Sequence, residues 1–421
     1  MQLLRYLKGR TAAYALAHAA KTLFWASSDV YFAFYLTEVC GISAASMGLI
    51  MAASYLANAV LDWRLGHSLA ARVRSARGAG QLQLFGAALS SATLLLFGLS
   101  ALSTVDWRLS SALAALLAFR ASYALYDLPQ NALLALAAKD ERERSRMAAA
   151  RLAVSGIARV TLTALFVPLF VRRGIDMQIT SFLVLAALMG VIGVCSAGLL
   201  ARTLRRDTVV ASGESRPYSP RQGKGLYIAM LVLSLGTTVF SQLEPYLAAW
   251  VLTSRWTAAA LLTAVALGTS LSQPLWLALV RRSSQRTAAI AALCVSALSA
   301  CLFPPIASVG GPFLAVIGLS YGAGVGGLFF ALWSAVARLA TRDHAQRGAT
   351  ATLGSFAACA KVGQAAALGL TGLYLQRLHA LEPMASAVSI ALMMAIAVLA
   401  ALGAVTVLGL TATRLLRAQS S

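Results

Sequence analysis

Ionisable residues occur inside stretches of this chain that are otherwise apolar. They are the carboxylates Asp29, Asp62, Asp127 and Glu244 and the cations Lys21, Arg120, Arg151, Arg159 and Lys361. A charged group in hydrocarbon costs roughly 2.5–3.5 kcal/mol on insertion scales, and it usually marks an ion or substrate pathway. Buried charges of both signs therefore favour a solute transporter over a passive membrane anchor.

The predicted helix at 44–70 places two polar residues on one face. Asn58 and Asp62 are four residues apart and so lie one turn from each other. Their oxygens suit a hard cation or a transferable proton, although a single carboxylate is too few ligands for a dedicated metal cage. The alternative interpretation is that Asp62 is a structural charge held by Arg64 or by a neighbouring helix.

The predicted helix at 109–138 repeats this arrangement. Tyr123 and Asp127 share a face, and Pro129 follows at a position where it can kink the helix. A carboxylate beside a kink can anchor a substrate. The alternative is a salt bridge from Asp127 that only holds helices together.

The first long apolar stretch, 12–38, carries a polar face. Lys21, Thr22, Trp25 and Asp29 belong to this face. Such a face can line a cavity, or it can hold helices together, since hydroxyl and other polar groups often join membrane helices. The sequence leaves these two alternatives open.

Lys361 lies near the middle of the stretch 348–375 and needs a partner, because an unpaired buried ammonium would lose its proton. We expect Asp62 to be this partner, with Asp127 as the second candidate. A cation or a substrate could change which of these three charges pair with each other. Coupled transport requires such a change. The alternative is a static ion pair that only holds the two halves together.

Three more charges have less specific surroundings. Arg151 and Arg159 occupy the stretch 147–171, and Arg151 can extend its side chain to the cytoplasmic surface. Glu244 precedes Pro245 toward the outer end of the stretch 226–252, where it can act as a gate.

The composition requires a membrane protein. Of 421 residues, 59% are hydrophobic and 12% are charged, whereas a soluble chain carries about 25% charged residues. Hydropathy over windows of about 19 residues predicts twelve membrane-spanning helices. The predicted spans are 12–38, 44–70, 79–102, 109–138, 147–171, 177–201, 226–252, 257–280, 287–307, 311–337, 348–375 and 384–413.

The net charge of +21 is explained by topology. With the N-terminus inside, most Lys and Arg residues fall in cytoplasmic loops, which is the positive-inside pattern. We therefore expect a multi-pass protein of a bacterial-type inner membrane with both termini cytoplasmic. We expect the lipid bilayer and a small molecule as partners, no nucleic acid, and a monomer.

The chain is predicted to consist of two six-helix halves. The polar segment 204–225 is predicted to be a cytoplasmic linker between residues 1–203 and 226–421. Two loop-helix segments resemble each other, KDERERSRMAAARLAVSGIARV at 139–160 and RDHAQRGATATLGSFAACAKV at 342–362. A duplication of six spans is the pattern of major-facilitator transporters, whose substrate site lies between the halves.

Other functional classes lack their motifs. The five cysteines are scattered without a CxxC pair, and no GxxxxGK[ST] loop occurs, so neither a zinc site nor an ATP-driven pump is predicted. No nucleophile-base set or cofactor motif indicates an enzyme. His18, the one histidine deep in a predicted span, is expected to be a hydrogen-bonded packing residue.

Several segments resemble the glycoside-pentoside-hexuronide:cation symporters. They are FYLTEVCGIS at 34–43 with the following Asn58-x-x-x-Asp62-x-x-x-Gly66 helix, ASYALYDLPQNALLAL at 121–136, KDERERSR at 139–146, Arg151, and Lys361 followed by Val-Gly. The resemblance implies the major-facilitator fold. It also implies that six residues match family positions for cation coupling or sugar binding: Asp62, Asp127, Tyr123, Arg151, Lys21 and Lys361.

Four positions depart from the pattern of that family. Its first acidic position on the second helix is Asn58 here, and its hydroxyl ligand on the fourth helix falls on Ala124. Its sugar-binding aspartate falls on Thr22, and its sugar-stacking tryptophan falls on Asn131. A sodium site is therefore incomplete. A proton is the expected coupling ion, and sodium is the second candidate.

The sequence thus predicts a secondary transporter of a small polar, sugar-like solute, coupled to a proton or another monovalent cation. A proton-driven exporter of an amphiphile, such as a siderophore, a drug or a lysolipid, is the alternative. The expected coupling residues are Asp62, Asn58 and Lys361. The expected substrate-binding residues are Asp127, Tyr123, Lys21, Thr22, Arg151, Asn131, Trp25 and Asp29.

Overall fold

The structure is a computed structural model in which the regular elements of the described residues are all helices. It describes residues 9–72, 75–137, 141–171, 173–206, 224–252, 254–343, 349–378 and 383–418. Every predicted span falls on a helix. The predicted all-α membrane architecture is therefore confirmed.

The chain divides into two compact units. Unit 1 comprises Met1–Ile42 and Val60–Glu214, and unit 2 comprises Ser43–Ala59 and Ser215–Ser421. The helix α4 (Ala44–Arg72) thus contributes its first part to unit 2 and its second part to unit 1. The predicted halves and linker stay a prediction, and residues 207–223 of that linker lie outside the described residues.

The other helices of unit 1 are α2 (Arg10–Val30), α3 (Phe32–Phe34), the π-helix η1 (Tyr35–Val39), α5 (Ala76–Leu99), the 3-10 helix η2 (Ser100–Leu102), α6 (Val105–Leu136), α7 (Glu141–Phe170) and α8 (Ile175–Thr203). The other helices of unit 2 are α9 (Lys224–Tyr246), the π-helix η3 (Leu247–Val251), α10 (Arg255–Leu271), α11 (Gln273–Arg282), α12 (Gln285–Val309), α13 (Pro312–Asp343), α14 (Ala349–Leu378) and α15 (Pro383–Ala418).

Ten of the helical segments in the described residues are long and apolar enough to cross a membrane. The two predicted spans outside this set are the first, α2 with α3 and η1, and the fifth, α7, whose apolar part Val154–Phe170 is shorter. These two spans carry Lys21 and Asp29 on α2 and Arg151 and Arg159 on α7.

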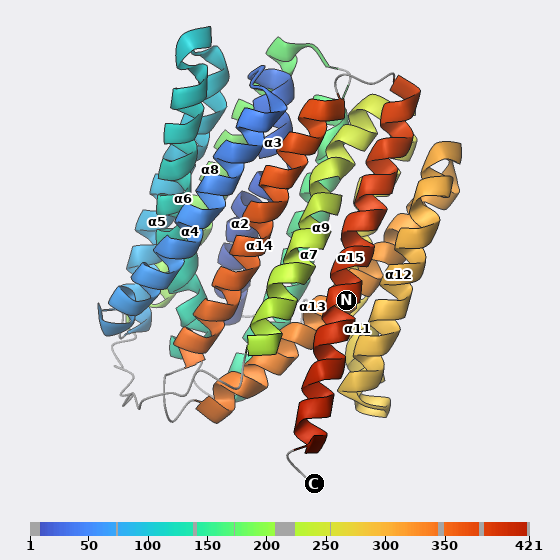
Figure 1. Ribbon diagram of the computed structural model, residues 1–421. Helices are drawn as coiled ribbons and strands as arrows, with labels where there is room; N and C mark the ends of the chain where they lie inside the picture. Colours follow the sequence, from blue (N-terminus) through green and yellow to red (C-terminus); the bar gives the residue numbers. More distant parts are fainter. Residues whose placement is uncertain are drawn as a thin grey trace. The chain divides into compact units, whose positions relative to one another are not determined.

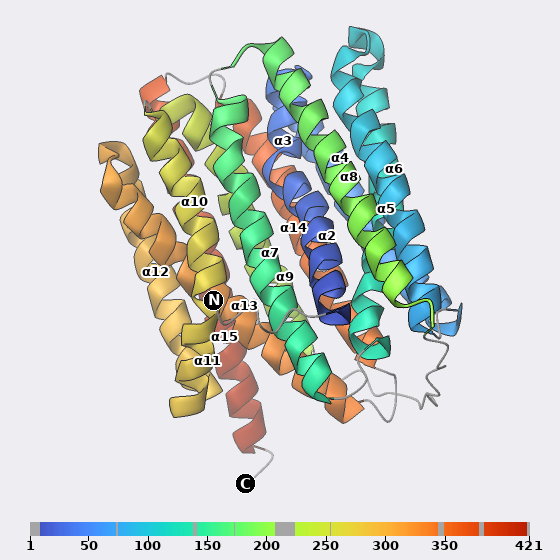
Figure 2. The same ribbon diagram turned by 180° about the vertical axis from the view of Figure 1, so that it is seen from behind.

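In unit 1, α5 packs on α6 and α8, and α2 packs on α7 and α8. Figure 2 shows α2 between α7 and α8. An aromatic cluster holds the end of this first span. The ring of Phe32 lies 4.2 Å from that of Phe97 and 5.4 Å from that of Phe119, and Tyr35 lies 4.3 Å from Phe182.

A second cluster holds the other end of α2. It contains Tyr14 and Ala17 of α2, Leu133 and Ala137 at the end of α6, and Met147 of α7. Membrane helices associate through close packing more than through a hydrophobic force, so such contacts determine the position of a helix. The two clusters fix both ends of α2 and leave the residues between them to carry the polar groups.

A glycine sets the distance between α5 and α6. A Cβ atom built on Gly86 would lie 2.4 Å from the backbone nitrogen of Tyr126. No real side chain fits there, so the two backbones touch at this point. This contact positions the turn of α6 that carries Tyr123 and Asp127.

In unit 2, α9 packs between α14 and α15, as Figure 1 shows, and α13 packs on α10 and α12. The first part of α4 also belongs here. A Cβ atom on Gly48 would lie 2.8 Å from the Cα atom of Gly372 on α14, so these helices approach closely. Asn58 therefore stands on a helical segment that packs within unit 2.

The first span of each unit ends in a π-helix of five residues. These are η1, which follows α2 and α3, and η3, which follows α9. A π-helix is rare and often accompanies a functional site, because it interrupts the regular hydrogen-bond ladder. No sequence motif predicted this feature, which follows α3 in unit 1 and α9 in unit 2.

Candidate functional site

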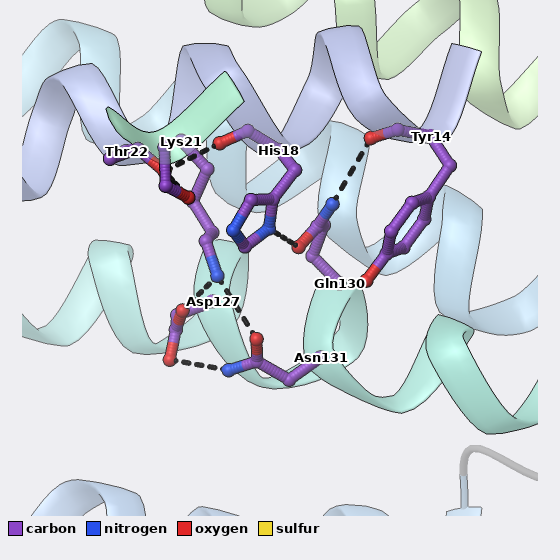
Figure 3. Close-up of polar contacts among 8 residues, drawn as sticks. Tyr14, His18, Lys21, Thr22, Asp127, Gln130 and Asn131 are labelled. Carbon is purple, nitrogen blue, oxygen red and sulfur yellow. Dashed lines mark hydrogen bonds and ion pairs between the residues drawn. The ribbon is translucent and has the colours of Figure 1, made fainter. Parts of the chain in front are cut away.

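Lys21 is the centre of a polar cluster inside unit 1. Its Nζ donates to Oδ1 of Asp127 at 2.5 Å and to Oδ1 of Asn131 at 3.1 Å. Figure 3 shows this side chain pointing from α2 toward α6. The Lys21 side chain is only 5% exposed. The structure thus pairs Lys21 with a carboxylate 106 residues away in the sequence.

Asp127 uses both carboxylate oxygens. Oδ1 accepts from Lys21, and Oδ2 accepts from Nδ2 of Asn131 at 2.9 Å. Asn131 lies one turn after Asp127 on α6, so its amide can bond to both members of the ion pair. The Asp127 side chain is still 20% exposed. A solute hydroxyl can therefore reach it without unfolding the helices.

His18 and Gln130 form a second polar contact one turn away. Nδ1 of His18 lies 2.7 Å from Oε1 of Gln130, and Nε2 of Gln130 donates to the carbonyl of Tyr14. That second bond orients the amide, so Oε1 is the acceptor and Nδ1 of His18 carries the hydrogen. The His18 ring also stacks on Tyr14. His18 is buried and hydrogen-bonded, as expected for a packing residue.

Thr22 connects α2 to α7. Its hydroxyl donates to the carbonyl of His18 at 2.8 Å and lies 3.3 Å from Oγ of Ser155. The first of these bonds stays within α2, and the second joins two helices. Thr22 thus borders the Lys21 cluster without carrying a charge.

Arg151 on α7 completes this cluster. It is close enough to Tyr14, Lys21 and His18 to interact electrostatically with all three. Among the residues that the structure describes, no carboxylate lies within ion-pair distance of Arg151. Among the described residues, Asp127 is the one carboxylate that belongs to this cluster.

Arg120 forms a second polar group in the same unit. It is fully buried, its Nη1 donates to Oγ of Ser28 at 3.1 Å, and its guanidinium lies 5.2 Å from the ring centroid of Trp25. A cation over an indole face is attracted by the charge distribution of the ring. Trp25 in turn contacts Tyr123, with ring centroids 5.5 Å apart.

Asp29 pairs with Arg159 on α7, with Oδ2 and Nη2 3.6 Å apart. Their side chains are 17% and 43% exposed, so this pair is more open than the Lys21 pair. Tyr123 lies between the two groups, because it interacts electrostatically with Asp127, Asp29 and Arg120. The predicted substrate residues of α2, α6 and α7 are thus brought together inside unit 1.

The predicted coupling residues are placed differently. Asn58 is 0% exposed, and neither of its amide atoms has a hydrogen-bond partner among the described residues. Asp62 is half-buried in unit 1, and Lys361 is half-buried in unit 2. Both of these charged residues make interactions. The pairing of Lys361 with Asp62 or Asp127 stays a prediction.

Glu244 is buried near the end of α9, directly before Pro245 and the π-helix η3. It interacts electrostatically with Tyr321, whose ring stacks on Phe240 at 3.9 Å. Its role as an outer gate stays a prediction. Within the described part of the chain, no group of three or more His, Cys, Asp or Glu residues is placed to hold a metal.

Sequence reasoning missed two residues of the site and one pairing. Gln130 and Ser155 were not singled out, and Arg159 was not expected to pair with Asp29. Gln130 had a signal, because it lies three residues after Asp127 and so near its face of α6. The other two contacts join α2 to α7, and no local spacing predicts which helices touch.

Comparison with known families supports these observations. The family described as MFS/sugar transport protein matches residues 13–416. No curated protein shows significant similarity to the chain.

Solved structures share the fold. A bacterial homologue of the human drug peptide transporters aligns with a TM-score of 0.70 at 12% identity, covering 97% of this chain and 99% of the other. The nucleoside transporter NupG aligns at 0.67 and 12% identity, covering 95% and 99%. A bacterial homologue of the iron transporter ferroportin, in an inward-facing state, aligns at 0.67 and 13% identity, covering 95% and 98%.

At these identities the solved structures establish the major-facilitator fold alone. The family match covers most of the chain and confirms the membership predicted from its motifs. The chain is therefore a multi-pass integral membrane protein of a transporter family, not of an enzyme family. It belongs to the MFS/sugar transport protein family of secondary transporters.

Proposed function

We propose that this secondary transporter moves a small polar, sugar-like solute by alternating access, coupled to a proton or another monovalent cation. The observation that carries the proposal is the hydrogen-bonded set of Lys21, Asp127 and Asn131 between otherwise apolar helices. A carboxylate, an ammonium and an amide together offer the acceptors and donors that solute hydroxyl groups need. Polar groups of this kind inside membrane helices usually serve transport.

In this proposal Asp127, Tyr123, Lys21 and Arg151 contact the solute directly. Thr22, Asn131, Trp25 and Asp29 complete the lining. The partial exposure of the Asp127 carboxylate supports this assignment, because its partner Lys21 is buried. A solute that bonds to Asp127 would compete with Lys21 and so change the contact between α2 and α6.

We assign the coupling role to Asp62, and we propose that Asn58 and Lys361 also take part in coupling. Asp62 is half-buried, and such a carboxylate can take up and release a proton during the transport cycle. The Asn58 amide has no partner among the described residues, so it can accept from a protonated Asp62 or bind a cation. We place the protein in a bacterial-type inner membrane with both termini cytoplasmic, on the basis of its basic loops.

Export of an amphiphile is the second candidate function. The supporting observation is that Trp25 already contacts Arg120 and Tyr123, so the aromatic surface left for a sugar ring is small. A siderophore, a drug or a lysolipid would depend less on such a platform. The direction of proton-driven flux separates this candidate from import.

A thermal-shift screen of the purified protein tests the proposal first. It would cover sugars, glycosides, siderophores and lysolipids, each at acidic and neutral pH with sodium or potassium. A ligand that binds only the folded state raises the Tm. Stabilisation by a saccharide supports import, and stabilisation by an amphiphile supports export. Sodium dependence without pH dependence contradicts the proton assignment.

Flux measurements in proteoliposomes then decide whether a stabilising ligand is transported. Counterflow exchange would show carrier-mediated movement, and an imposed pH gradient would show coupling and its direction. A ligand that binds but does not exchange contradicts its assignment as the substrate.

A further inference from the structure

We propose that Gln83 on α5 supplies the hydrogen-bond donor that α6 lacks at Pro129, and that Gln83 thereby positions Asp127. The inference goes beyond the proposed function, because it concerns how the ion pair of Lys21 and Asp127 is held in place and not which solute is moved. Its basis is a buried amide that lies at the level of a proline-containing turn on the neighbouring helix.

The Gln83 side chain is buried inside unit 1 without a visible partner. It is 0% exposed, and neither its Nε2 nor its Oε1 has a hydrogen-bond partner among the described residues. An unpaired amide costs free energy when it is buried, so buried polar groups in folded proteins nearly always have partners. The amide of a glutamine can both donate and accept hydrogen bonds. We therefore expect Gln83 to bond to a polar group of an adjacent helix.

The adjacent helix α6 has a polar group that needs a donor. Pro129 lies inside α6, and a proline has no backbone N–H. In a regular helix, residue 129 would donate to the carbonyl of Leu125, four residues earlier. This carbonyl therefore lacks its regular helical donor. Membrane helices tolerate prolines because neighbouring helices, side chains or ordered waters supply partners for the freed group.

Two contacts fix how α5 and α6 face each other. Oγ1 of Thr93 lies 2.8 Å from Oγ of Ser122, and a Cβ atom on Gly86 would lie 2.5 Å from the carbonyl oxygen of Leu125. Residue numbers fall along α5 as they rise along α6, so the two helices run antiparallel. Gln83, about one turn before Gly86, thus lies at the level of the turn that follows Leu125. The carbonyls of a helix point toward its C-terminal end, so the Leu125 carbonyl points toward this level.

A hydrogen bond from Gln83 to this carbonyl would act on the ion pair. Nε2 can donate to the carbonyl oxygen after a rotation of the side chain, or through one bridging water. Asp127 lies inside the same turn of α6, and its carboxylate accepts from Lys21. The bend of α6 at this turn therefore determines where the carboxylate stands. Gln83 is a positioning residue, because it acts on Asp127 through the backbone of α6.

The first test compares four full-length proteins by thermal unfolding in detergent. Gln83→Met removes the amide and keeps the length of the side chain. We expect it to lower the Tm by about 2 °C or more, because the Leu125 carbonyl loses its donor. Pro129→Ala restores a backbone N–H at this carbonyl. In the Pro129→Ala background, Gln83→Met should therefore leave the Tm unchanged or raise it.

Gln178→Met is the matched control. Gln178 on α8 is also a buried glutamine of unit 1, and its Nε2 donates to the carbonyl of Phe170 on α7 at 2.6 Å. Its loss should lower the Tm as well. The decrease should be equal in the wild-type and Pro129→Ala backgrounds, because the partner of Gln178 is on a different helix from Pro129.

Two further readouts test the effect on Asp127. In Gln83→Met, hydrogen exchange at the backbone amides of Gln130 and Asn131 should become about threefold to tenfold faster, the loss of one hydrogen bond. The energetic coupling between Lys21→Met and Asp127→Asn should also be smaller in the Gln83→Met background than in the wild type. A role in stability alone would leave this coupling unchanged.

Several outcomes would contradict the inference. A higher Tm for Gln83→Met in the wild-type background would show that the amide has no partner, and equal losses in both backgrounds would separate it from Pro129. Unchanged exchange and unchanged coupling would reject the positioning of Asp127. If Gln83→Met does not fold, Gln83→Asn, which keeps an amide on a shorter side chain, undergoes the same comparison. None of these measurements uses a solute, so their failure is distinguishable from a failure of the proposed function.

Discussion

Lys21 on α2 and Asp127 on α6 form an ion pair whose atoms lie 2.5 Å apart, and Asn131 bonds to both members. The pair joins the first and fourth spans of unit 1 at a level between two packed clusters. A substrate that engages Asp127 therefore acts on a contact that holds two helices together.

The stability of this pair can be measured by a double-mutant comparison. Lys21→Met or Asp127→Asn alone leaves one buried charge without its partner, which costs about 3–5 kcal/mol in buried pairs. The double variant removes both charges, so we expect its Tm to lie above that of either single variant. Thermal unfolding in detergent measures all four proteins. A double variant whose loss equals the sum of the two single losses would show that the pair does not couple the helices.

Asp127→Ala is expected to abolish both solute accumulation and counterflow exchange, because it removes the carboxylate that we propose the solute contacts. Transport in proteoliposomes measures both activities, and the Tm verifies that the variant is folded. Asp106→Ala serves as a control, since Asp106 is an exposed residue in the first turn of α6. Wild-type exchange kinetics in folded Asp127→Ala would remove Asp127 from the site.

Asp62→Asn is expected to separate coupling from binding. The amide cannot exchange a proton, so uphill accumulation driven by a pH gradient should be lost, whereas counterflow exchange should remain near the wild-type rate. Both fluxes are measured on the same vesicles, with the wild type as the reference. Retained uphill transport in this variant would reject the coupling role of Asp62.

The sequence predicted the helices better than their contacts. Each long apolar run falls on a helix, because hydrocarbon tolerates few other structures. Charges within these runs identified Lys21, Asp29, Asp127 and Arg159 as unusual. The spacing along one helix also placed Tyr123 with Asp127 on α6, and the structure brings this pair together with Lys21.

The choice of partners could not be predicted. The pairing of Lys361 with Asp62 or Asp127 stays a prediction, while the pairs that the structure shows, Lys21 with Asp127 and Asp29 with Arg159, were not foreseen. Which helices touch depends on packing, such as the close approach of α5 to α6 at Gly86. No periodicity of a single helix carries this information, and the π-helices η1 and η3 likewise had no signal in the sequence.

Arg120→Lys is expected to destabilise the protein although it keeps the charge. Lysine is a compact cation without a planar fork, so it cannot lie over Trp25 and also reach Ser28 in the same way. The loss of a buried cation–ring contact is about 2 kcal/mol. Thermal unfolding should show a lower Tm, whereas Arg282→Lys at an exposed position should not change it. Equal Tm values for both variants would show that Arg120 acts by charge alone.

Gly86→Ala is expected to disturb the site from a distance. The added Cβ would meet the backbone of α6 at 2.4 Å, so α5 and α6 must move apart, and overpacking of this kind costs about 1–3 kcal/mol. The turn that carries Asp127 would shift, so substrate affinity should fall together with the Tm. Gly403→Ala is the matched control, because that helical glycine of α15 has open space around its Cβ position. Unchanged Tm and Kd in Gly86→Ala would show that this contact does not position the site.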